Sequence, residues 1–357
     1  MPAVPNRRKR GIVIAIGVLV ACLIAAIAWS ELHPKALAEA EASYRRGNFE
    51  LALSKARSHL NRRSFSRAAL LTAARSLSSL DRSEQAEPYY NKAGALNLED
   101  QHTRALGIVK GNLRAQAIEA YQQILTRWPD DVLALRRLAA VQISESRWAE
   151  ALQTAKRLIA IPAGAVIGHT LAGVVHHNTT NIDQSVVEFG RALDLDPELK
   201  LMPLTPRSMF WEEYGQDLLA TGQAVLAEKC LHRALAESGN ATIADLLGQS
   251  YYQQGEIEEA ERCWRYTLDL DPNRADTWWR IGRLQLQQDK LEDAVASLLR
   301  AAQLAPKAIE PAFSLSLAYR RMGRREEADR LQAEVSRLRD KTAALRGGMG
   351  SMPSLAP

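Results

Sequence analysis

A repeating pattern with a period of about 34 residues constrains the fold of this 357-residue chain more than any other feature. The clearest unit spans residues 241–272 (ATIADLLGQSYYQQGEIEEAERCWRYTLDLDP), where apolar or small residues recur three and four positions apart in two stretches separated at Gly255. This spacing predicts a helix, a tight turn and a second helix. Pro272 is expected to end the second helix, because the residue before a proline is disfavoured in helical geometry.

A small residue marks the same position of the second helix in each of nine units. The markers are Ala52, Ala86, Ala117, Ala151, Ser185, Ala227, Ala260, Ala294 and Ala328. Consecutive markers are 34, 31, 34, 34, 42, 33, 34 and 34 residues apart. The step of 31 predicts a shortened third unit, and the step of 42 predicts an insertion near residues 198–206. Two prolines indicate that this insertion is a loop, and we expect it to divide the array into five and four repeats.

The units resemble the tetratricopeptide repeat (TPR) family, whose signature places Trp, Leu, Gly or Ala, and Tyr on the first helix and Ala, an aromatic residue, Ala and Pro on the second. Trp211, Tyr214 and Gly215 match this signature, as do Gly255 in a turn and Pro272 at a repeat end. The resemblance implies an all-α tetratricopeptide-repeat α-solenoid of about nine helix-turn-helix repeats over residues 36–338. Such a solenoid has a long concave surface that binds a peptide or another protein. Residues 339–357 contain Gly, Pro and Ser without helical periodicity, which predicts a disordered tail.

The N-terminal segment predicts one transmembrane helix before the repeats. Residues 11–29 (GIVIAIGVLVACLIAAIAW) contain neither charge nor proline, and a helix of this length nearly spans a hydrocarbon core of about 30 Å. The basic residues Arg7–Arg10 within residues 1–10 favour a cytoplasmic N-terminus. We therefore expect a single-pass membrane protein whose signal anchor is residues 11–29 and whose repeats lie on the opposite side, in the periplasm or another extracytoplasmic space.

Two kinds of processing compete with a retained anchor. Ala26-Ile27-Ala28 resembles a signal-peptidase site, although the apolar run is longer than the roughly 7–15 residues of a cleaved signal peptide. Leu19-Val20-Ala21-Cys22 resembles the lipobox of bacterial lipoproteins, but the mature chain would then begin deep in apolar sequence.

Composition and motifs argue against most chemical functions. Lys and Arg number 46 against 41 Asp and Glu, so the formal charge is only +5, and Arg7–Arg10 supply most of it. This balance argues against nucleic-acid binding, which needs a clustered basic face. The sequence has no Walker, Rossmann, zinc-protease or nucleophile-elbow motif, so we predict no enzyme activity and no cofactor.

The histidines and cysteines of the chain do not predict a metal site or a disulfide. His169, His176 and His177 form the only histidine cluster; the repeat register makes the first two packing residues and turns His177 toward the groove, so no metal site is predicted. Cys230 and Cys263 occupy equivalent positions in consecutive repeats. Packed helices lie about 8–10 Å apart, farther than a disulfide allows, so both are predicted to be packing residues.

The repeat register predicts which side chains face the concave groove. Trp279 should point about 100° away from its neighbour Trp278, and Tyr252 and Phe313 are its counterparts in the adjacent repeats. The groove-facing positions are Gln249, Tyr252 and Gln253 in the seventh repeat, Trp279, Arg283 and Gln287 in the eighth, and Phe313, Leu317, Arg320 and Arg321 in the ninth. Of these, the predicted peptide-binding residues are Tyr252, Trp279, Arg283, Phe313 and Arg320. An aromatic row flanked by arginines suits a partner protein or peptide with an apolar or acidic extended segment. The alternative is that Trp279 merely fills a tightly wound groove.

Together these features predict a membrane-tethered TPR adaptor that binds a partner protein and has no catalysis of its own. The architecture is similar to scaffolds that assist envelope-protein assembly or maturation. The alternative is a cytosol-facing import receptor or chaperone co-receptor. Its two-carboxylate clamp of Lys, Asn and Arg is not matched, because the first repeat has Leu37 and Glu41 where clamp residues are expected. A further alternative is an enzyme whose site is carried by the solenoid.

Overall fold

The computed structural model describes residues 35–201 and 207–349. The expected cytoplasmic N-terminus at residues 1–10 and the expected span at residues 11–29 lie outside these segments, so both stay predictions. None of the helices in the described segments is both long and apolar enough to span a bilayer.

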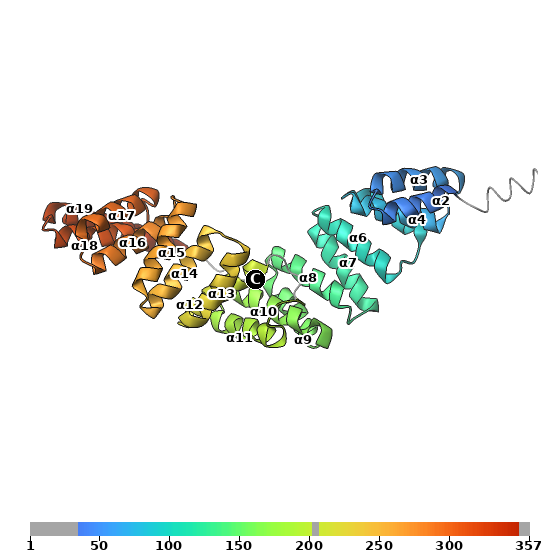
Figure 1. Ribbon diagram of the computed structural model, residues 1–357. Helices are drawn as coiled ribbons and strands as arrows, with labels where there is room; N and C mark the ends of the chain where they lie inside the picture. Colours follow the sequence, from blue (N-terminus) through green and yellow to red (C-terminus); the bar gives the residue numbers. More distant parts are fainter. Residues whose placement is uncertain (1–34, 202–206, 350–357) are drawn as a thin grey trace, which may run out of the picture. The chain divides into compact units, whose positions relative to one another are not determined.

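The described residues form eighteen α-helices and one short 3₁₀ helix, and they contain no strand. The elements are α2 (Lys35–Arg45), α3 (Phe49–Arg62), α4 (Arg67–Ser79), α5 (Ser83–Ala93), α6 (Leu98–Lys110), α7 (Arg114–Arg127), α8 (Val132–Ser144), α9 (Trp148–Ile159), η1 (Pro162–Gly164), α10 (Ala165–Asn178), α11 (Ile182–Leu195), α12 (Arg207–Ala220), α13 (Ala224–Glu237), α14 (Ala241–Gln254), α15 (Ile257–Leu270), α16 (Ala275–Gln287), α17 (Leu291–Leu304), α18 (Ile309–Arg321) and α19 (Arg325–Met349). They form nine helix pairs, from α2/α3 to α18/α19, each joined by a tight turn (Figure 1). The predicted all-α fold of about nine repeats is confirmed.

The turn within each pair has the same left-handed backbone conformation in all nine repeats. Glycine takes this position in four of them, at Gly47, Gly222, Gly255 and Gly323, with φ between 75° and 82°. In the other five repeats the residue is Asp81, Asn112, Ser146, Thr180 or Asp289, with φ between 56° and 62°. Each of these nine residues precedes its small marker residue by five positions. The sequence period therefore locates the turn even where glycine is absent.

The nine marker residues belong to the buried core of the array. All nine are at most 1% exposed. The paired helices are also close at Gly248 on α14, where an added Cβ atom would lie 2.5 Å from Nε1 of Trp264 on α15. Small side chains at these positions let the helix pairs close.

The chain divides between α9 and α10, not at the insertion. One compact unit comprises residues 1–164 with four helix pairs, and the other comprises residues 165–357 with five. The expected division into five and four repeats at the insertion is therefore wrong. The insertion itself is present, since residues 196–206 separate α11 from α12. Phe189 of α11 still packs edge-to-face on Phe210 of α12, with ring centroids 4.9 Å apart, so one core is continuous across it.

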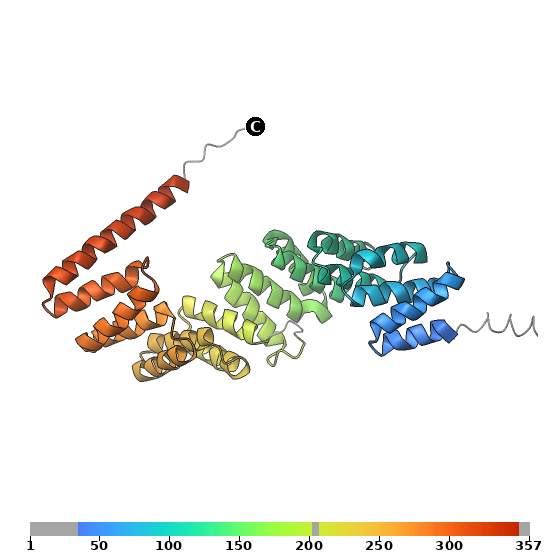
Figure 2. The ribbon, with the colours of Figure 1, turned by 90° about the horizontal axis from the view of Figure 1, so that it is seen from above.

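The helical array also continues beyond its predicted end. Figure 2 shows α19 as a single long helix, and it ends at Met349 rather than at Leu338. The reason is local. Residues 341–346 (KTAALR) consist largely of strong helix formers, and the first glycine within α19 is Gly347. The expectation of disorder from residue 339 is therefore wrong for residues 339–349, and residues 350–357 lie outside the described segments.

Candidate functional site

The three aromatic residues predicted to face the groove lie on the first helices of the last three repeats. Tyr252 is on α14, Trp279 on α16 and Phe313 on α18. Two cavities lie between these helices. The first, of about 200 Å³, is lined by Gln249, Tyr252, Gln253, Trp264, Arg280, Arg283 and Leu284. The second, of about 400 Å³, is lined by Trp279, Arg283, Leu286, Gln287, Glu310, Phe313, Ser314, Leu317 and Arg321.

Arg283 lines both cavities, so they adjoin at this residue. We call the two cavities together the α14–α18 groove. Four of the five predicted binding residues, Tyr252, Trp279, Arg283 and Phe313, line it. The structure thus brings together residues that are up to 61 positions apart in the sequence.

Trp279 is fixed at the centre of the groove by contacts from two helices. Its Nε1 donates a hydrogen bond to Oγ of Ser314, at 3.0 Å. One part of the ring packs against the core of the last two repeats, while another part lines the second cavity. The ring therefore both supports the packing and presents a surface inside the groove.

Arg283 stacks on this ring without being held by a carboxylate. Its guanidinium carbon lies 4.9 Å from the ring centroid of Trp279. Within the described residues no hydrogen bond or ion pair engages its guanidinium. Arg280 on the same helix differs, because its Nε lies 3.5 Å from Oδ2 of Asp245 on α14. Arg283 is consequently the groove arginine whose N–H donors are available to a ligand.

Hydrogen bonds between consecutive repeats fix the walls of the groove. Gln287 donates through Nε2 to the Tyr252 hydroxyl at 2.8 Å. Arg321 donates to the Leu286 carbonyl at 2.6 Å and to Oδ1 of Asp289 at 2.8 Å. These contacts link α14 to α16 and α18 to the end of α16, so the spacing of the three helices is defined by side chains as well as by the core.

Arg320, the fifth predicted residue, does not line the groove. Its guanidinium lies 3.9 Å from Asp329 on α19, at an exposed position. Successive residues of a helix differ by about 100° in direction. The neighbouring Arg321, which the repeat register also predicted to face the groove, does line it.

Sequence reasoning did not single out Arg280, Leu286, Glu310 and Ser314, which also line the groove. None belongs to a repeat signature. Ser314 directly follows Phe313 in sequence, but its role depends on the Trp279 ring 35 residues away. A pattern within one repeat carries no such information.

Two of the three clustered histidines, His169 and His177, contact carboxylates. Nδ1 of His169 lies 2.7 Å from Oε2 of Glu188, and both side chains are buried. Nδ1 of His177 lies 2.7 Å from Oδ1 of Asp217. Within the described residues no three His, Cys, Asp or Glu side chains are arranged to hold a metal ion.

A second carboxylate lies one turn from Asp217 on α12. Burial raises the pKa of Glu213 to about 7, an effect that His177 opposes and Asp217 reinforces. The hydrogen bond to Asp217 raises the pKa of His177. These groups lie between the fifth and sixth repeats, outside the α14–α18 groove.

Both described cysteines carry free thiols. Cys230 is 7% exposed within the core, and burial raises its pKa to about 11. Burial also raises the pKa of Cys263. Raised pKa values keep thiols protonated and poorly reactive at neutral pH.

Two segments of the chain, residues 102–166 and 246–309, match the family model described as "Tetratricopeptide repeat". The chain contains tetratricopeptide repeats. The second matched segment covers α14, α15, α16 and α17, and therefore two of the three helices that form the α14–α18 groove.

Two curated proteins are similar in sequence. "Protein CTR9 homolog" of Arabidopsis thaliana is 23% identical over an alignment of 306 residues, and the match covers 74% of this chain and 28% of that protein. The "Peroxisomal targeting signal receptor" of Eremothecium gossypii is 27% identical over 109 residues, which are 30% of this chain and 19% of that protein. The chain thus matches under a third of the length of these relatives.

Several solved structures are also similar to part of this chain. The crystal structure of YrrB, described as a TPR protein with an unusual peptide-binding site, has a TM-score of 0.48 at 19% identity and covers 54% of this chain and 96% of its own. MamA from Desulfovibrio magneticus RS-1 has a TM-score of 0.43 at 20% identity, covering 48% of this chain and 94% of its own.

Proposed function

We propose that this protein is a membrane-tethered TPR adaptor that binds an extended segment of a partner protein in the α14–α18 groove. The observation that carries the proposal is the position of Arg283. Its guanidinium is stacked on Trp279, lines both cavities and is engaged by no carboxylate of the described chain. A stacked guanidinium keeps its N–H donors in a fixed plane, which favours bidentate binding of a carboxylate.

The walls of the groove define the chemistry of the partner segment. On one side of Arg283 the second cavity offers the apolar surfaces of Trp279, Phe313 and Leu317, of which Phe313 is 45% exposed. On the other side the first cavity offers the amides of Gln249 and Gln253. A segment with a carboxylate at Arg283 and apolar side chains toward Phe313 complements this arrangement. Burial of such aromatic and arginine surfaces supplies most of the free energy in many interfaces.

The cellular setting belongs to the same proposal. Residues 11–29 tether the protein to a membrane with residues 1–10 in the cytoplasm, and the repeats act on the opposite, extracytoplasmic side as a scaffold in assembly or maturation of envelope proteins. The adaptor carries no catalysis of its own, and the partner is a protein or peptide rather than a nucleic acid.

A cytosol-facing import receptor is the second candidate. The match to a protein named as a peroxisomal targeting signal receptor supports recognition of a short peptide signal by repeats of this kind. The α14–α18 groove serves either function in the same way, and the two differ in which side of the membrane the repeats occupy.

Photo-crosslinking tests the binding function. A photoreactive amino acid replaces Phe313 in the full chain, expressed in the source cells, and a second variant carries it at Leu299. Leu299 is a fair control because it is also exposed, at 38%, but lies on the second helix of its repeat and outside the groove. We expect a discrete crosslinked polypeptide from position 313, none from position 299, and loss of the product when Arg283→Gln is added.

Equal products from both positions would contradict a site in the groove, and so would a product that is insensitive to Arg283→Gln. Protease digestion of sealed, oriented inner-membrane vesicles decides between the two settings. Repeats on the extracytoplasmic side support the scaffold, and repeats on the cytoplasmic side support the import receptor.

A further inference from the structure

The most exposed large apolar side chain of the described residues lies far from the groove, in the turn between α3 and α4. Phe65 is 87% exposed, whereas no other large apolar side chain in the described segments exceeds the 65% of Leu201. The ring makes no packing contribution that would explain its presence. A phenylalanine at the tip of a turn is costly in water and favourable at an apolar or interfacial surface.

Basic residues surround this phenylalanine. The local sequence is Arg62-Arg63-Ser64-Phe65-Ser66-Arg67. Over residues 35–93 as a whole there are eleven Lys and Arg against six Asp and Glu. This excess of five positive charges in two repeats contrasts with the near balance of the whole chain.

Some of these cations are hydrogen-bonded within the fold, whereas others have no carboxylate partner in the described segments and are available to a ligand. Arg67 donates to the carbonyls of Ala93 and Ala95 and so ties the start of α4 to the end of α5. By contrast, Arg62 and Lys92 are exposed, and no carboxylate of the described residues pairs with either.

A cleft opens beside Phe65 between α3, α4 and α5. It has a volume of about 470 Å³ and is lined by Arg57, Leu60, Asn61, Ser64, Leu70, Pro88, Tyr89 and Lys92. Arg57 is oriented by a hydrogen bond from its Nε to the Tyr89 hydroxyl, at 3.1 Å. The cleft therefore combines two cations and small polar groups with the apolar side chains of Leu60, Leu70 and Pro88. This lining suits a phosphate that carries a hydrophobic substituent.

The helix topology places this surface at the end of the unit where the N-terminal segment enters. The helices α2 and α3 form a hairpin, so the start of α2 at Lys35 and the end of α3 at Arg62 lie at the same end. Lys92, near the end of α5, lies at this end as well. The predicted span ends at Trp29, and six residues of extended chain cover at most about 20 Å. A retained span would hold this end of the first two repeats close to the bilayer surface.

We propose that Arg57, Arg62, Phe65 and Lys92, which we call the basic end, form a contact site for anionic phospholipids. Phe65 enters the interfacial zone of the bilayer, and the three cations bind lipid phosphates around it. Basic residues next to an anionic membrane gain from its surface potential, and an aromatic ring anchors the same surface in the interface. The contact would fix the orientation of the first repeats at the membrane independently of partner binding in the α14–α18 groove.

Fluorescence in vesicles tests this contact. An environment-sensitive fluorescent amino acid replaces Phe65 in the full chain, and a second chain carries it at Asn48, which is also exposed but lies at the opposite end of α3. Both chains are incorporated into vesicles of phosphatidylcholine alone or of phosphatidylcholine and phosphatidylglycerol in equal parts. We expect a blue shift at position 65 only in the anionic vesicles, which high salt weakens, and none at position 48.

Charge-matched variants separate a specific contact from general attraction. Arg62→Gln with Lys92→Gln should largely abolish the shift at position 65. Arg46→Gln with Arg82→Gln removes the same charge at the opposite end of the helices and should leave the shift intact. All four residues are exposed, so the variants are expected to fold.

Each remaining outcome would overturn the proposal. An equal shift in neutral vesicles would show that the span alone brings position 65 to the surface, and the absence of any shift would show that the basic end does not reach it. A shift produced by inorganic phosphate without vesicles would indicate a site for free anions. Binding of single-stranded RNA with the same dependence on Arg62 and Lys92 would indicate a nucleic-acid surface.

Discussion

His177 on α10 and Asp217 on α12 are joined by a hydrogen bond of 2.7 Å between Nδ1 and Oδ1. They belong to consecutive repeats on the two sides of the insertion at residues 196–206. Asp217 is only 1% exposed, and Glu213 lies one turn before it on the same helix. Within the described residues, Oε2 of Glu213 and Oδ2 of Asp217 are buried without a hydrogen-bond partner. The interface between these two repeats therefore contains a buried carboxyl, Glu213, whose charged form is disfavoured by burial.

The first prediction is that this interface becomes less stable as the pH rises. Burial raises the pKa of Glu213 from 4.5 to about 7, so between these values the folded chain retains a proton that the unfolded chain has lost. Stability therefore falls as pH rises through this window. The raised pKa of His177 acts in the same direction, because its stabilisation is complete below 6.5 and is lost as pH rises through the folded-state pKa.

Denaturant unfolding at a series of pH values, followed by circular dichroism, measures this effect. In the wild type, Glu213 should lower the unfolding free energy by about 1–2 kcal/mol as the pH rises from 4.5 to 7, and Glu213→Gln should remove this decline. The value is smaller than the full pKa shift would give, because Glu213 is not wholly buried. Glu258→Gln, at an exposed position on α15, should leave the decline as it is. A Glu213→Gln chain that differs from the wild type by the same amount at every pH would contradict the assignment.

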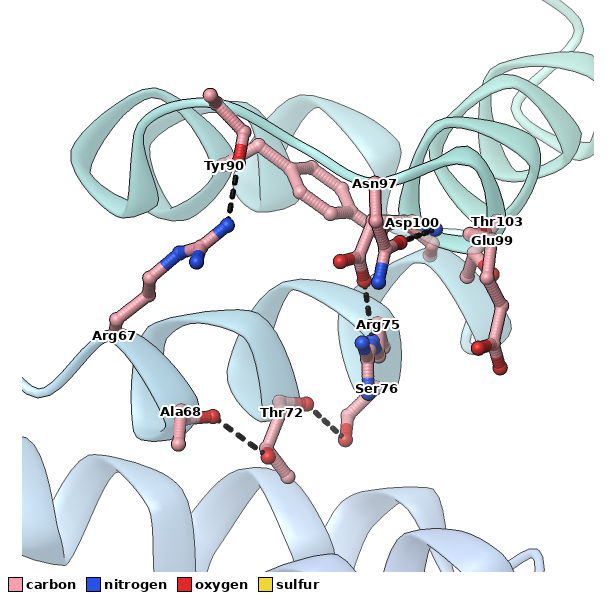
Figure 3. Close-up of polar contacts among 12 residues, drawn as sticks. Arg67, Ala68, Thr72, Arg75, Ser76, Tyr90, Asn97, Glu99, Asp100 and Thr103 are labelled. Carbon is pink, nitrogen blue, oxygen red and sulfur yellow. Dashed lines mark hydrogen bonds and ion pairs between the residues drawn. The ribbon is translucent and has the colours of Figure 1, made fainter.

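The second prediction concerns the ion pair between Arg75 and Asp100 in the first unit. Nε of Arg75 lies 2.5 Å from Oδ1 of Asp100, which is wholly buried (Figure 3). Removing one partner of a buried pair leaves an uncompensated charge, so Arg75→Met should cost about 3 kcal/mol of unfolding free energy. The exposed pair of Lys55 and Glu39 provides the control, and Lys55→Met should cost at most about 1 kcal/mol. Similar losses in the two variants would show that the buried pair contributes no more to stability than the exposed one.

The third prediction concerns helix approach at Gly248. A Cβ atom there would lie 2.5 Å from Nε1 and 2.6 Å from Cδ1 of Trp264, so the indole has to move. Nε1 of Trp264 also donates to the Asp245 carbonyl, and movement would break that bond. Gly248→Ala should therefore destabilise the protein by about 1–3 kcal/mol in thermal or denaturant unfolding. Gly239→Ala is the matched control, because a Cβ atom at Gly239 meets nothing within 4 Å. Equal stability of the two variants would mean that the α14/α15 pair has room to spare.

The repeats could be predicted in detail because their determinants are local. The small markers and the turn residues keep a fixed spacing of five positions, so the period predicts the left-handed turn at Asp81 or Thr180 although neither is glycine. Helix geometry also predicted that Trp279 faces the groove, and its ring lines the second cavity, while its role in binding a partner stays a prediction.

Contacts between repeats were beyond this reasoning. Both Arg320 and Arg321 were expected to face the groove, but of the two only Arg321 lines it, held by the Leu286 carbonyl and Asp289 in the preceding repeat. The division of the chain at Gly164 was missed for a similar reason. Prolines in the insertion indicated a break, but the packing of Phe189 on Phe210 keeps the adjoining repeats in one core.

The last prediction separates partner binding from stability in the α14–α18 groove by comparing two arginines of one helix. Arg283 contributes only its stacking on Trp279, so Arg283→Gln should change the unfolding free energy by at most about 1 kcal/mol. Arg280 lies near the buried Asp245, whose Oδ1 also accepts a hydrogen bond from Thr277. Arg280→Gln should therefore cost about 1–2 kcal/mol. Crosslinking from position 313 should respond in the opposite order, with the product lost in Arg283→Gln and retained in Arg280→Gln at a temperature where both variants are folded. If the product follows stability instead, and is lost in Arg280→Gln but kept in Arg283→Gln, then Arg283 is not the group that recognises the partner.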